Sequence, residues 1–375
     1  MTNKRVVVIG GGPAGHDAAT YAARFGADVT LIERDIVGGS AHLRDCVPSK
    51  SMIATGAALS FAQRLDGMGL ANVETEVDAD HLRARIQGIE KRLEQSVTQL
   101  LMSQGVVIHR GTGRLLGHHE VCADTADGPV ELTADAIVLA TGSRPRLPEW
   151  ASIDKERVLT TRDAYPPDEI PGHLVVVGSG VTGVEFVHMF ASLGSKVTLI
   201  VSRQQVLPQK DPEAAALLEQ NFLDRGVQLL KGARATEITR RGKSVEVLCS
   251  DGRIAKGTHV LLAIGSEPNS QELGLANTQV VVDESGYIEV DHNLRSSVPN
   301  IYAAGDLSGK LPLSSVASMQ GRKIAEHIMG LHEGREHRHL DYDKAASAIF
   351  TEPEIADVGL AEAEAFATGR KIRVT

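Results

Sequence analysis

The sequence has few cysteines, few aromatic residues and no long apolar run. Its three cysteines, Cys46, Cys122 and Cys249, are an odd number without CxxC spacing, which excludes a disulfide framework and a zinc site of that type and suits a reducing compartment. The longest apolar runs, such as Val6 to Ile9 and Val260 to Ile264, fall far short of the ~20 residues in a membrane span. No export segment precedes the first run. We therefore expect a cytoplasmic protein without a membrane span or a bound metal.

The sequence also has no excess of basic over acidic residues. Lys and Arg number 39 against 48 Asp and Glu, which gives a formal net charge of -9. Proteins bind nucleic acid largely by neutralising phosphates with Lys and Arg, so we expect no nucleic-acid partner. The 375 residues predict two or three domains at ~150 residues each. A hydrophobic content of 42% and 37 glycines fit a folded α/β protein with many tight turns.

The most informative feature present is a repeat. Residues 6–9 form an apolar run that is followed by a glycine-rich loop, a helical segment and a second apolar run at residues 28–33. The same order returns at residues 174–177, with a glycine-rich loop at 178–183 and a second run at 196–201. Parallel strand-helix-strand units of this kind predict two doubly wound, Rossmann-like α/β domains.

Each repeat closes with an apolar strand and a turn of small residues, at residues 136–145 and 260–269. A later strand at residues 300–304 ends in Gly305 and Asp306, and we expect it in the first sheet. The second repeat is then an insertion in the first domain. We also expect an amphipathic helix over residues 82–101, ended by Gly105, and a strand at residues 287–290.

The first glycine loop has the residues needed to bind a dinucleotide. Gly10 permits the tight turn, Gly12 lets a pyrophosphate approach the backbone, and Gly15 lets the helix pack closely on the strand. The positive end of the helix dipole then faces the phosphates. Glu33 closes the second strand, where an acid accepts hydrogen bonds from ribose hydroxyls.

The second loop has the same glycines but a different ending. Ser202 and Arg203 follow its second strand, and no acid stands there. An acid would repel a 2′-phosphate, whereas a hydroxyl donates to it and a guanidinium pairs with it, which favours NADPH. The alternative is that Arg203 is a solvated surface residue and that the site takes NADH with weak discrimination.

Residues 37–50, VGGSAHLRDCVPSK, carry a resemblance to a known family. Together with both glycine loops, Thr141-Gly142 and Ala303-Ala304-Gly305-Asp306, they resemble the pyridine nucleotide disulfide oxidoreductases, which include dihydrolipoamide dehydrogenase and glutathione reductase. The resemblance implies that the first repeat binds FAD, that the inserted repeat binds NAD(P)H, and that the nicotinamide stacks against the flavin.

The resemblance also implies two sets of binding residues. The candidates for FAD are Gly10, Gly12, Pro13, Ala14, Gly15, Glu33, Gly39, Ser40, Lys50, Gly113, Thr141, Gly142, Ser143, Asp306, Leu313 and Ser314. Among them, Asp306 would hold the ribityl chain and Gly113 would lie against the adenine. The candidates for NAD(P)H are Gly178, Gly180, Val181, Thr182, Gly183, Ser202, Arg203 and Gly265.

Four segments follow from the repeat and the resemblance. Residues 1–146 are the first part of an FAD-binding domain, 147–271 an NAD(P)H-binding domain, and 272–338 the second part of the FAD or central domain. Residues 349–359 resemble the opening of the family's interface domain, which forms a homodimer. We therefore expect residues 339–375 to be the beginning of a truncated interface domain.

One departure from the family pattern bears on function. The family's redox disulfide joins two cysteines five residues apart, and here Ala41 occupies the first position while Cys46 occupies the second. Thiol-disulfide exchange needs an attacking thiolate and a resolving partner, so disulfide reduction by the usual route is not expected. Within the family, this pattern resembles the flavoprotein NAD(P)H quinone reductases that lack the dithiol.

Three residues are candidates for the catalytic machinery. The resemblance implies that Lys50 lies beside flavin N5 and pairs with Glu185, where a fixed positive charge favours reduced flavin. The same pair is also consistent with a purely structural salt bridge. Cys46 is either a reactive thiol or a small residue with an inert one.

These inferences lead to one main hypothesis and two alternatives. We expect an FAD-dependent oxidoreductase that passes electrons from NAD(P)H to a quinone-like, small-molecule acceptor. The first alternative is a dihydrolipoamide dehydrogenase-like enzyme, or a single-cysteine disulfide or peroxide reductase that uses Cys46. The second is a flavin-binding sensor or interaction protein with little turnover.

Overall fold

The structure is a computed structural model that describes residues 3–63, 65, 68–69, 75–165, 168–331 and 339–373. Contacts within the chain divide it into two compact units. The first unit comprises Met1–Cys46, Gly88–Arg144 and Ser266–Tyr342, and the second comprises Val47–Gln87, Pro145–Gly265 and Asp343–Thr375. This division differs from the sequence-based domain limits at residues 47–87 and at Asp343–Thr375, which both group with the second unit. The ligand assigned to each domain stays a prediction.

The first unit is built on a seven-stranded sheet in the order β17-β6-β1-β2-β3-β4-β5. The strands are β1 (Arg5–Ile9), β2 (Asp28–Glu33), β3 (Val107–Leu115), β4 (Glu120–Thr125), β5 (Gly128–Thr133), β6 (Ala136–Leu139) and β17 (Ile301–Ala303). Neighbours from β17 to β3 pair in parallel, and β3, β4 and β5 pair antiparallel. The helices are α1 (Pro13–Arg24), η1 (Ala41–Cys46), η4 (Leu275–Asn277), η5 (Gly305–Ser308) and α6 (Ser314–Ile328).

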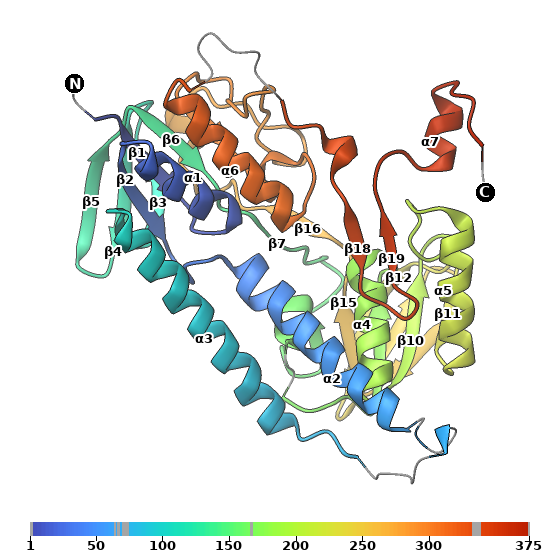
Figure 1. Cartoon of the computed structure of the whole chain (residues 1–375). Coiled ribbons are helices and arrows are strands. Elements are labelled where there is room, and N and C mark those ends of the chain that lie inside the picture. Colours follow the sequence, from blue (N-terminus) through green and yellow to red (C-terminus); the bar gives the residue numbers. More distant parts are fainter. Residues whose placement is uncertain are drawn as a thin grey trace. The chain divides into compact units, whose positions relative to one another are not determined.

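Alternation along β1 explains the layers of the first unit. Val6 and Val8 face one hydrophobic core with the alanine-rich side of α1 and with α6, whereas Val7 and Ile9 face a second core with β4 and the segment after residue 273. Helices α1 and α6 lie side by side on their face of the sheet (Figure 1). The sheet is therefore buried on both faces at β1, as parallel sheets are.

The second unit is built on a five-stranded parallel sheet in the order β11-β10-β9-β15-β8. The strands are β8 (Val158–Thr160), β9 (His173–Val177), β10 (Lys196–Val201), β11 (Gln228–Lys231) and β15 (His259–Leu262). An antiparallel sheet contains β12 (Ala235–Arg241), β13 (Ser244–Cys249) and β14 (Ile254–Gly257), and a hairpin contains β18 (Ser347–Ile349) and β19 (Ile355–Asp357). The helices are α2 (Val47–Gln63), η3 (Thr161–Ala164), α4 (Val181–Ser192), α5 (Pro212–Asp224), η6 (Tyr342–Lys344) and α7 (Glu362–Ala367).

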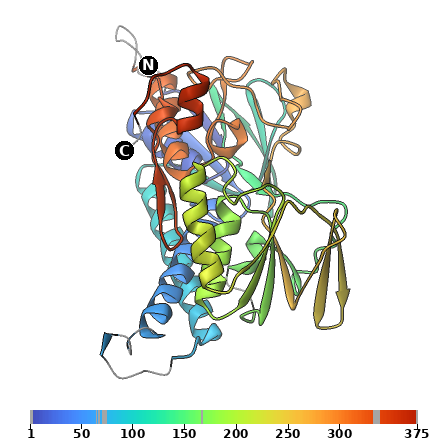
Figure 2. The same ribbon diagram turned by 90° about the vertical axis from the view of Figure 1, so that its right-hand side faces the viewer.

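The same alternation builds the second unit. Leu174 and Val176 of β9 pack against α4 and α5, while Val175 and Val177 pack against β13 and β14. Figure 2 shows α5 on one side of the parallel sheet and the three-stranded sheet on the other. Three buried phenylalanines, Phe186, Phe190 and Phe222, fill the helical side.

Most elements expected from the sequence are present. Two sheets with parallel strand-helix-strand units, the first with an antiparallel edge, confirm the α/β fold class, and β17 pairs with β6 in the first sheet. Helix α3 (Ala79–Ser103) confirms the amphipathic helix, although Leu100 is exposed. Residues 287–290 were expected to form a strand, but only an isolated bridge between Val282 and Ile288 is found there. Strands β7 (Ser143–Pro145) and β16 (Ser266–Pro268) pair where the chain passes between the two units.

Candidate functional site

The first glycine loop, between β1 and α1, contains glycines of two kinds. Gly10 has a φ of +100°, and a Cβ there would lie 2.4 Å from the carbonyl oxygen of Ala140. A Cβ on Gly15 would lie 1.8 Å from the carbonyl oxygen of Gly10. These two glycines are required by the fold itself, because any side chain would collide with backbone.

The fold does not require a glycine at position 12. Its φ is -68°, and a Cβ there would meet only the Cα of Gly39, at 3.8 Å. Gly12 caps α1 and Pro13 opens the helix, and no side chain caps the first N–H groups of the helix. A pyrophosphate running past this helix end fits both features, since it needs the space at Gly12 and accepts from the N–H groups.

The second loop, between β9 and α4, repeats this construction. Gly178 has a φ of +112°, and its Cβ would lie 2.2 Å from the carbonyl oxygen of Ala263; that of Gly183 would lie 1.9 Å from the carbonyl oxygen of Gly178. A Cβ on Gly180 would meet nothing within 4 Å. Val181 and Thr182 are exposed in the first turn of α4. The space in front of each helix thus fits a dinucleotide phosphate.

The two repeats differ where their second strands end. Glu33, at the end of β2, is buried; its Oε2 accepts from the Gly11 N–H at 2.6 Å and its Oε1 from the Asp35 N–H at 2.7 Å. The loop backbone therefore holds the carboxylate beside the glycine turn, where it can accept from ribose hydroxyls. At the end of β10, Ser202 and Arg203 are exposed instead.

A second group of predicted residues meets at the carboxyl ends of β6 and β17. Ser143 Oγ donates to Asp306 Oδ2 at 2.6 Å, so the two candidates are brought together. The Gly142 carbonyl accepts from the Asn269 N–H at 2.9 Å, and Thr141 Oγ1 donates to the Asn269 carbonyl at 2.9 Å. The carboxyl edge of a parallel sheet is the usual place for ligands in such folds.

Gln320 was missed by the sequence analysis. It is fully buried in α6, and its Oε1 accepts from the Gly305 N–H at 2.7 Å, which orients the backbone next to Asp306. No motif in the sequence marks Gln320. The available signal was a polar residue at an apolar position of a helix. Its neighbour Gly321 lets α6 cross α1 closely, since a Cβ there would lie 2.1 Å from the Ala14 carbonyl oxygen.

The remaining predicted residues are explained by local packing to different degrees. A Cβ on Gly39 would lie 2.4 Å from the Gly12 Cα, and one on Gly113 would lie 2.7 Å from the Ile9 side chain, so packing alone requires both glycines. Ser40 Oγ donates to Asp35. Leu313 and Ser314 begin α6, again without a side-chain cap, and Gly265 has a φ of +98° with open space around it.

Lys50 and Glu185 form an ion pair within the second unit. Lys50 Nζ of α2 lies 3.1 Å from Glu185 Oε2 of α4, and Glu185 is buried while the Lys50 side chain is about one third exposed. The other carboxylate oxygen accepts from the Phe350 N–H at 3.0 Å. The pairing implied by the resemblance is present; its place beside a flavin stays a prediction.

The three cysteines form no disulfide. Cys46 is half-buried and ends η1, a π-helix that begins at Ala41 and continues into α2, with Pro48 in the first turn where its missing N–H is tolerated. Cys122 and Cys249 are buried in strands, and burial raises the pKa of each thiol. Neither buried thiol is suited to replace the one absent at Ala41.

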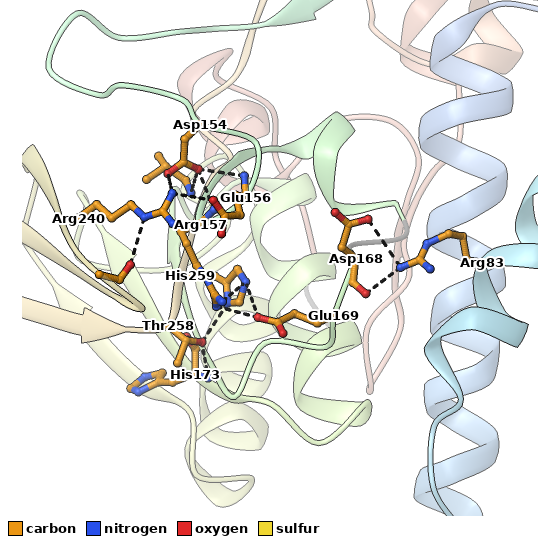
Figure 3. A network of polar contacts seen from close by, with 12 residues as sticks. Arg83, Asp154, Glu156, Arg157, Asp168, Glu169, His173, Arg240, Thr258 and His259 are labelled. Carbon is orange, nitrogen blue, oxygen red and sulfur yellow. Dashed lines mark hydrogen bonds and ion pairs between the residues drawn. The ribbon is translucent and has the colours of Figure 1, made fainter.

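A separate polar network in the second unit contains none of the predicted site residues (Figure 3). Asp154 accepts from the N–H groups of residues 156, 157 and 158 and from Arg240, and these bonds, working against the cost of partial burial, hold its pKa well below its usual range. Arg157 lies 2.7 Å from Glu169 and 3.2 Å from the buried His259. The network ties the entry of β8 to β15, which is a structural role.

Within the described residues, no group of three or more His, Cys, Asp or Glu side chains could hold a metal ion. No helix in the same part of the chain is long and apolar enough to cross a membrane.

The comparisons with known proteins agree with this geometry. A profile of the family described as pyridine nucleotide-disulphide oxidoreductase matches residues 4–321. The chain belongs to this family. Members depend on FAD and use NAD(P)H, and the chain is an oxidoreductase.

Individual relatives in the family are named for different activities. The chain is 42% identical to an NAD(P)H dehydrogenase (quinone) of Mycobacterium tuberculosis, over 95% of this chain and 74% of that protein. It is 34% identical to a dihydrolipoyl dehydrogenase of Chlamydia muridarum, over 98% and 78%. The crystal structure of LpdA from Mycobacterium tuberculosis superposes with a TM-score of 0.91 at 40% identity, covering 97% of this chain and 80% of that one.

Proposed function

We propose that this oxidoreductase passes electrons from NAD(P)H through FAD to a quinone-like small molecule. The observation that carries the proposal is Ala41, which stands at the first position of the π-helix where the family's dithiol needs a cysteine, while Cys122 and Cys249 are buried in strands. The name of the mycobacterial relative, NAD(P)H dehydrogenase (quinone), supports it.

In this proposal, the chain's own residues bind and orient, and bound FAD supplies the electron transfer. The open end of α1 and the carboxylate of Glu33 hold the FAD pyrophosphate and ribose, and Asp306 with Ser143 holds the ribityl chain. The open end of α4 holds the coenzyme phosphates in residues 147–271, while residues 1–146 and 272–338 hold FAD. Lys50, paired with Glu185, supplies a fixed positive charge beside the flavin ring.

The coenzyme preference belongs to the same proposal. Ser202 and Arg203 are exposed at the end of β10 and carry no negative charge, so they accept a 2′-phosphate that an acid would repel. We therefore expect NADPH to be used at least as well as NADH. A cytoplasmic location, and a homodimer through residues 339–375, stay predictions from the sequence.

Rapid mixing under anaerobic conditions tests the proposal. The purified holoenzyme is reduced with NADPH and then mixed with a quinone, with lipoamide or with a peroxide. We expect reoxidation by the quinone, retained within several-fold in Cys46→Ser, and a far larger loss in Lys50→Ala. If Cys46→Ser is reduced normally but no longer reoxidised by the quinone, a single-thiol route replaces the direct one. If no acceptor reoxidises the protein, the sensor or interaction alternative is favoured.

A further inference from the structure

The hairpin of β18 and β19 places one residue, Phe350, against both members of the Lys50–Glu185 pair. The Phe350 N–H donates to Glu185 Oε1 at 3.0 Å, and the Lys50 Nζ lies 4.5 Å from the centroid of the Phe350 ring. Lys50 Nζ lies 3.1 Å from Glu185 Oε2. Three groups from α2, α4 and the hairpin therefore contact one another within the second unit.

Each contact restricts a different freedom. The two oxygens of Glu185 accept from different donors, so the carboxylate cannot rotate without losing one bond. Lys50 has a flexible four-carbon stem and is about one third exposed, so an ion pair alone leaves it many rotamers. The ring face attracts the ammonium from another side. Together the carboxylate and the ring define one place for the Lys50 charge.

The hairpin is itself held in place. Ile349 is 1% exposed and belongs to the hydrophobic core of the second unit, and Thr351 is buried with its hydroxyl bonded to the Pro353 carbonyl. At the other end, Lys210 Nζ lies 2.6 Å and 2.7 Å from the two oxygens of Asp357. Phe350 lies between these anchors, so its N–H and ring are fixed relative to α4.

We propose that Phe350 is a positioning residue for Lys50, and that through it the hairpin sets the electrostatic environment of the flavin. This inference rests on the proposed place of Lys50 beside the flavin. Phe350 acts through Lys50, because its ring contacts Lys50 and its N–H binds the partner of Lys50, Glu185. An ammonium that is not held in one place is more fully hydrated and favours the reduced, more negative flavin less.

The test measures the midpoint potential of bound FAD by anaerobic titration with a chemical reductant, together with the flavin absorption spectrum. Phe350→Leu removes the ring but keeps the N–H, Phe350→Tyr keeps both, and Phe366→Leu is the control because Phe366 is exposed in α7. We expect Phe350→Leu to lower the equilibrium constant for two-electron reduction about tenfold, which is about 30 mV. Phe350→Tyr and Phe366→Leu should match the wild type.

A double-mutant cycle separates positioning from a general structural effect. In a Lys50→Met background, Phe350→Leu should leave the potential and spectrum unchanged, because the charge through which it acts is gone. An equal shift in both backgrounds, or no shift in the single variant, overturns the proposal. If Phe350→Leu does not retain FAD, Phe350→Met enters the same cycle. The titration uses no quinone, so failure of quinone turnover leaves this result intact, and failure here leaves the acceptor experiment intact.

Discussion

At the scale of single residues, the two glycine loops have the same backbone conformation but are followed by chemically different residues at the end of the second strand. Gly12 and Gly180 occupy equivalent positions; a Cβ on Gly180 would meet nothing within 4 Å, and one on Gly12 would make only an ordinary contact with the Gly39 Cα at 3.8 Å. Beyond them, the first repeat presents a buried carboxylate at Glu33 and the second presents an exposed hydroxyl and guanidinium at Ser202 and Arg203. Because the backbone is shared, we propose that the ending residues decide which nucleotide each loop prefers.

Arg203 is expected to read the 2′-phosphate of NADPH. Replacing it with alanine removes one charge-assisted contact that is partly exposed, worth roughly 1 to 2 kcal/mol, or about tenfold in affinity. Arg203→Ala should therefore raise the KM for NADPH about tenfold and leave the KM for NADH nearly unchanged. Arg370→Ala, at an exposed position after α7, is the matched control. Equal effects of Arg203→Ala on the two coenzymes would contradict the assignment.

His188 is expected to make stability depend on pH. It is buried in α4, its Nδ1 accepts from Arg225 at 2.9 Å, and burial with the nearby Arg225 charge lowers its pKa to about 4 from 6.5. Between those values the unfolded chain takes up a proton that the folded chain refuses, so stability falls as the pH falls. The loss is on the order of 3 kcal/mol.

Urea unfolding at pH 7 and pH 4.5 measures this effect. His188→Gln should be less stable than the wild type at pH 7, because packing is lost, but it should lose less stability on acidification. If the free energy of unfolding falls equally in the two proteins between pH 7 and pH 4.5, His188 does not carry the pH dependence.

At the scale of elements, the β18–β19 hairpin shows how a short segment is held by its ends. Ile349 anchors it in the core, while Lys210 and Ser347 donate to Asp357. Partial burial opposes the charge on Asp357, but the hydrogen bonds from Lys210 and Ser347 outweigh it and lower its pKa from 3.8. The folded carboxylate thus keeps its charge at a pH where an unfolded one is protonated.

The hairpin should therefore be secured at neutral pH and should loosen in acid. The stabilisation by Asp357 is full above pH 3.8, the ordinary pKa of an aspartate, and it is lost as the pH falls through the lowered pKa of the folded state. Solvent screening limits this stabilisation to about 1 kcal/mol. Hydrogen exchange of the Phe350 N–H reports this opening. We expect Asp357→Asn to reduce protection at pH 7, whereas the control Asp343→Asn should not. Wild-type protection of that N–H in Asp357→Asn would refute the anchor.

At the scale of the whole molecule, each compact unit contains its own glycine loop and its own sheet of mainly parallel strands. The same substitution can therefore be made in either unit, and we expect it to weaken the binding of a different ligand in each. Alanine at position 12 or 180 is compatible with the fold, because φ is -68° or -73° and a Cβ finds no close neighbour. Alanine at Gly10 or Gly15 is not, because a Cβ there collides with backbone.

Gly12→Ala and Gly180→Ala should thus separate the two ligands. We expect Gly12→Ala to fold but to lose affinity for FAD by tenfold or more, about 1.4 kcal/mol, because the methyl group enters the path of the pyrophosphate. Gly180→Ala should keep its FAD and raise the KM for NAD(P)H instead. The flavin-to-protein absorbance ratio and steady-state kinetics measure the two effects. The site assignment fails if Gly12→Ala purifies with full FAD content or if Gly180→Ala loses it.

Much of the fold was predictable because it depends on local order. The repeated strand, glycine turn, helix and strand correspond to β1-α1-β2 and β9-α4-β10, since periodicity and turn chemistry act over a few residues. Residues 287–290 were not predicted correctly: a short segment of strand-forming residues does not make a strand without a neighbour to pair with, and only the Val282–Ile288 bridge forms there. The grouping of residues 47–87 with the second unit also has no local signal.

The sequence by itself determined the family, the two glycine loops between strand and helix, and the alanine at position 41 where the family's dithiol needs a cysteine, because each is carried by residue types at short, regular spacings. Only the tertiary structure decided which glycines the fold requires and which leave room for a ligand, since that depends on what a Cβ would meet. It also decided that Gln320 supports the backbone at Asp306 and that Phe350 completes the Lys50–Glu185 pair. Those contacts join residues 15 to 300 positions apart, so they exist only once the chain has packed.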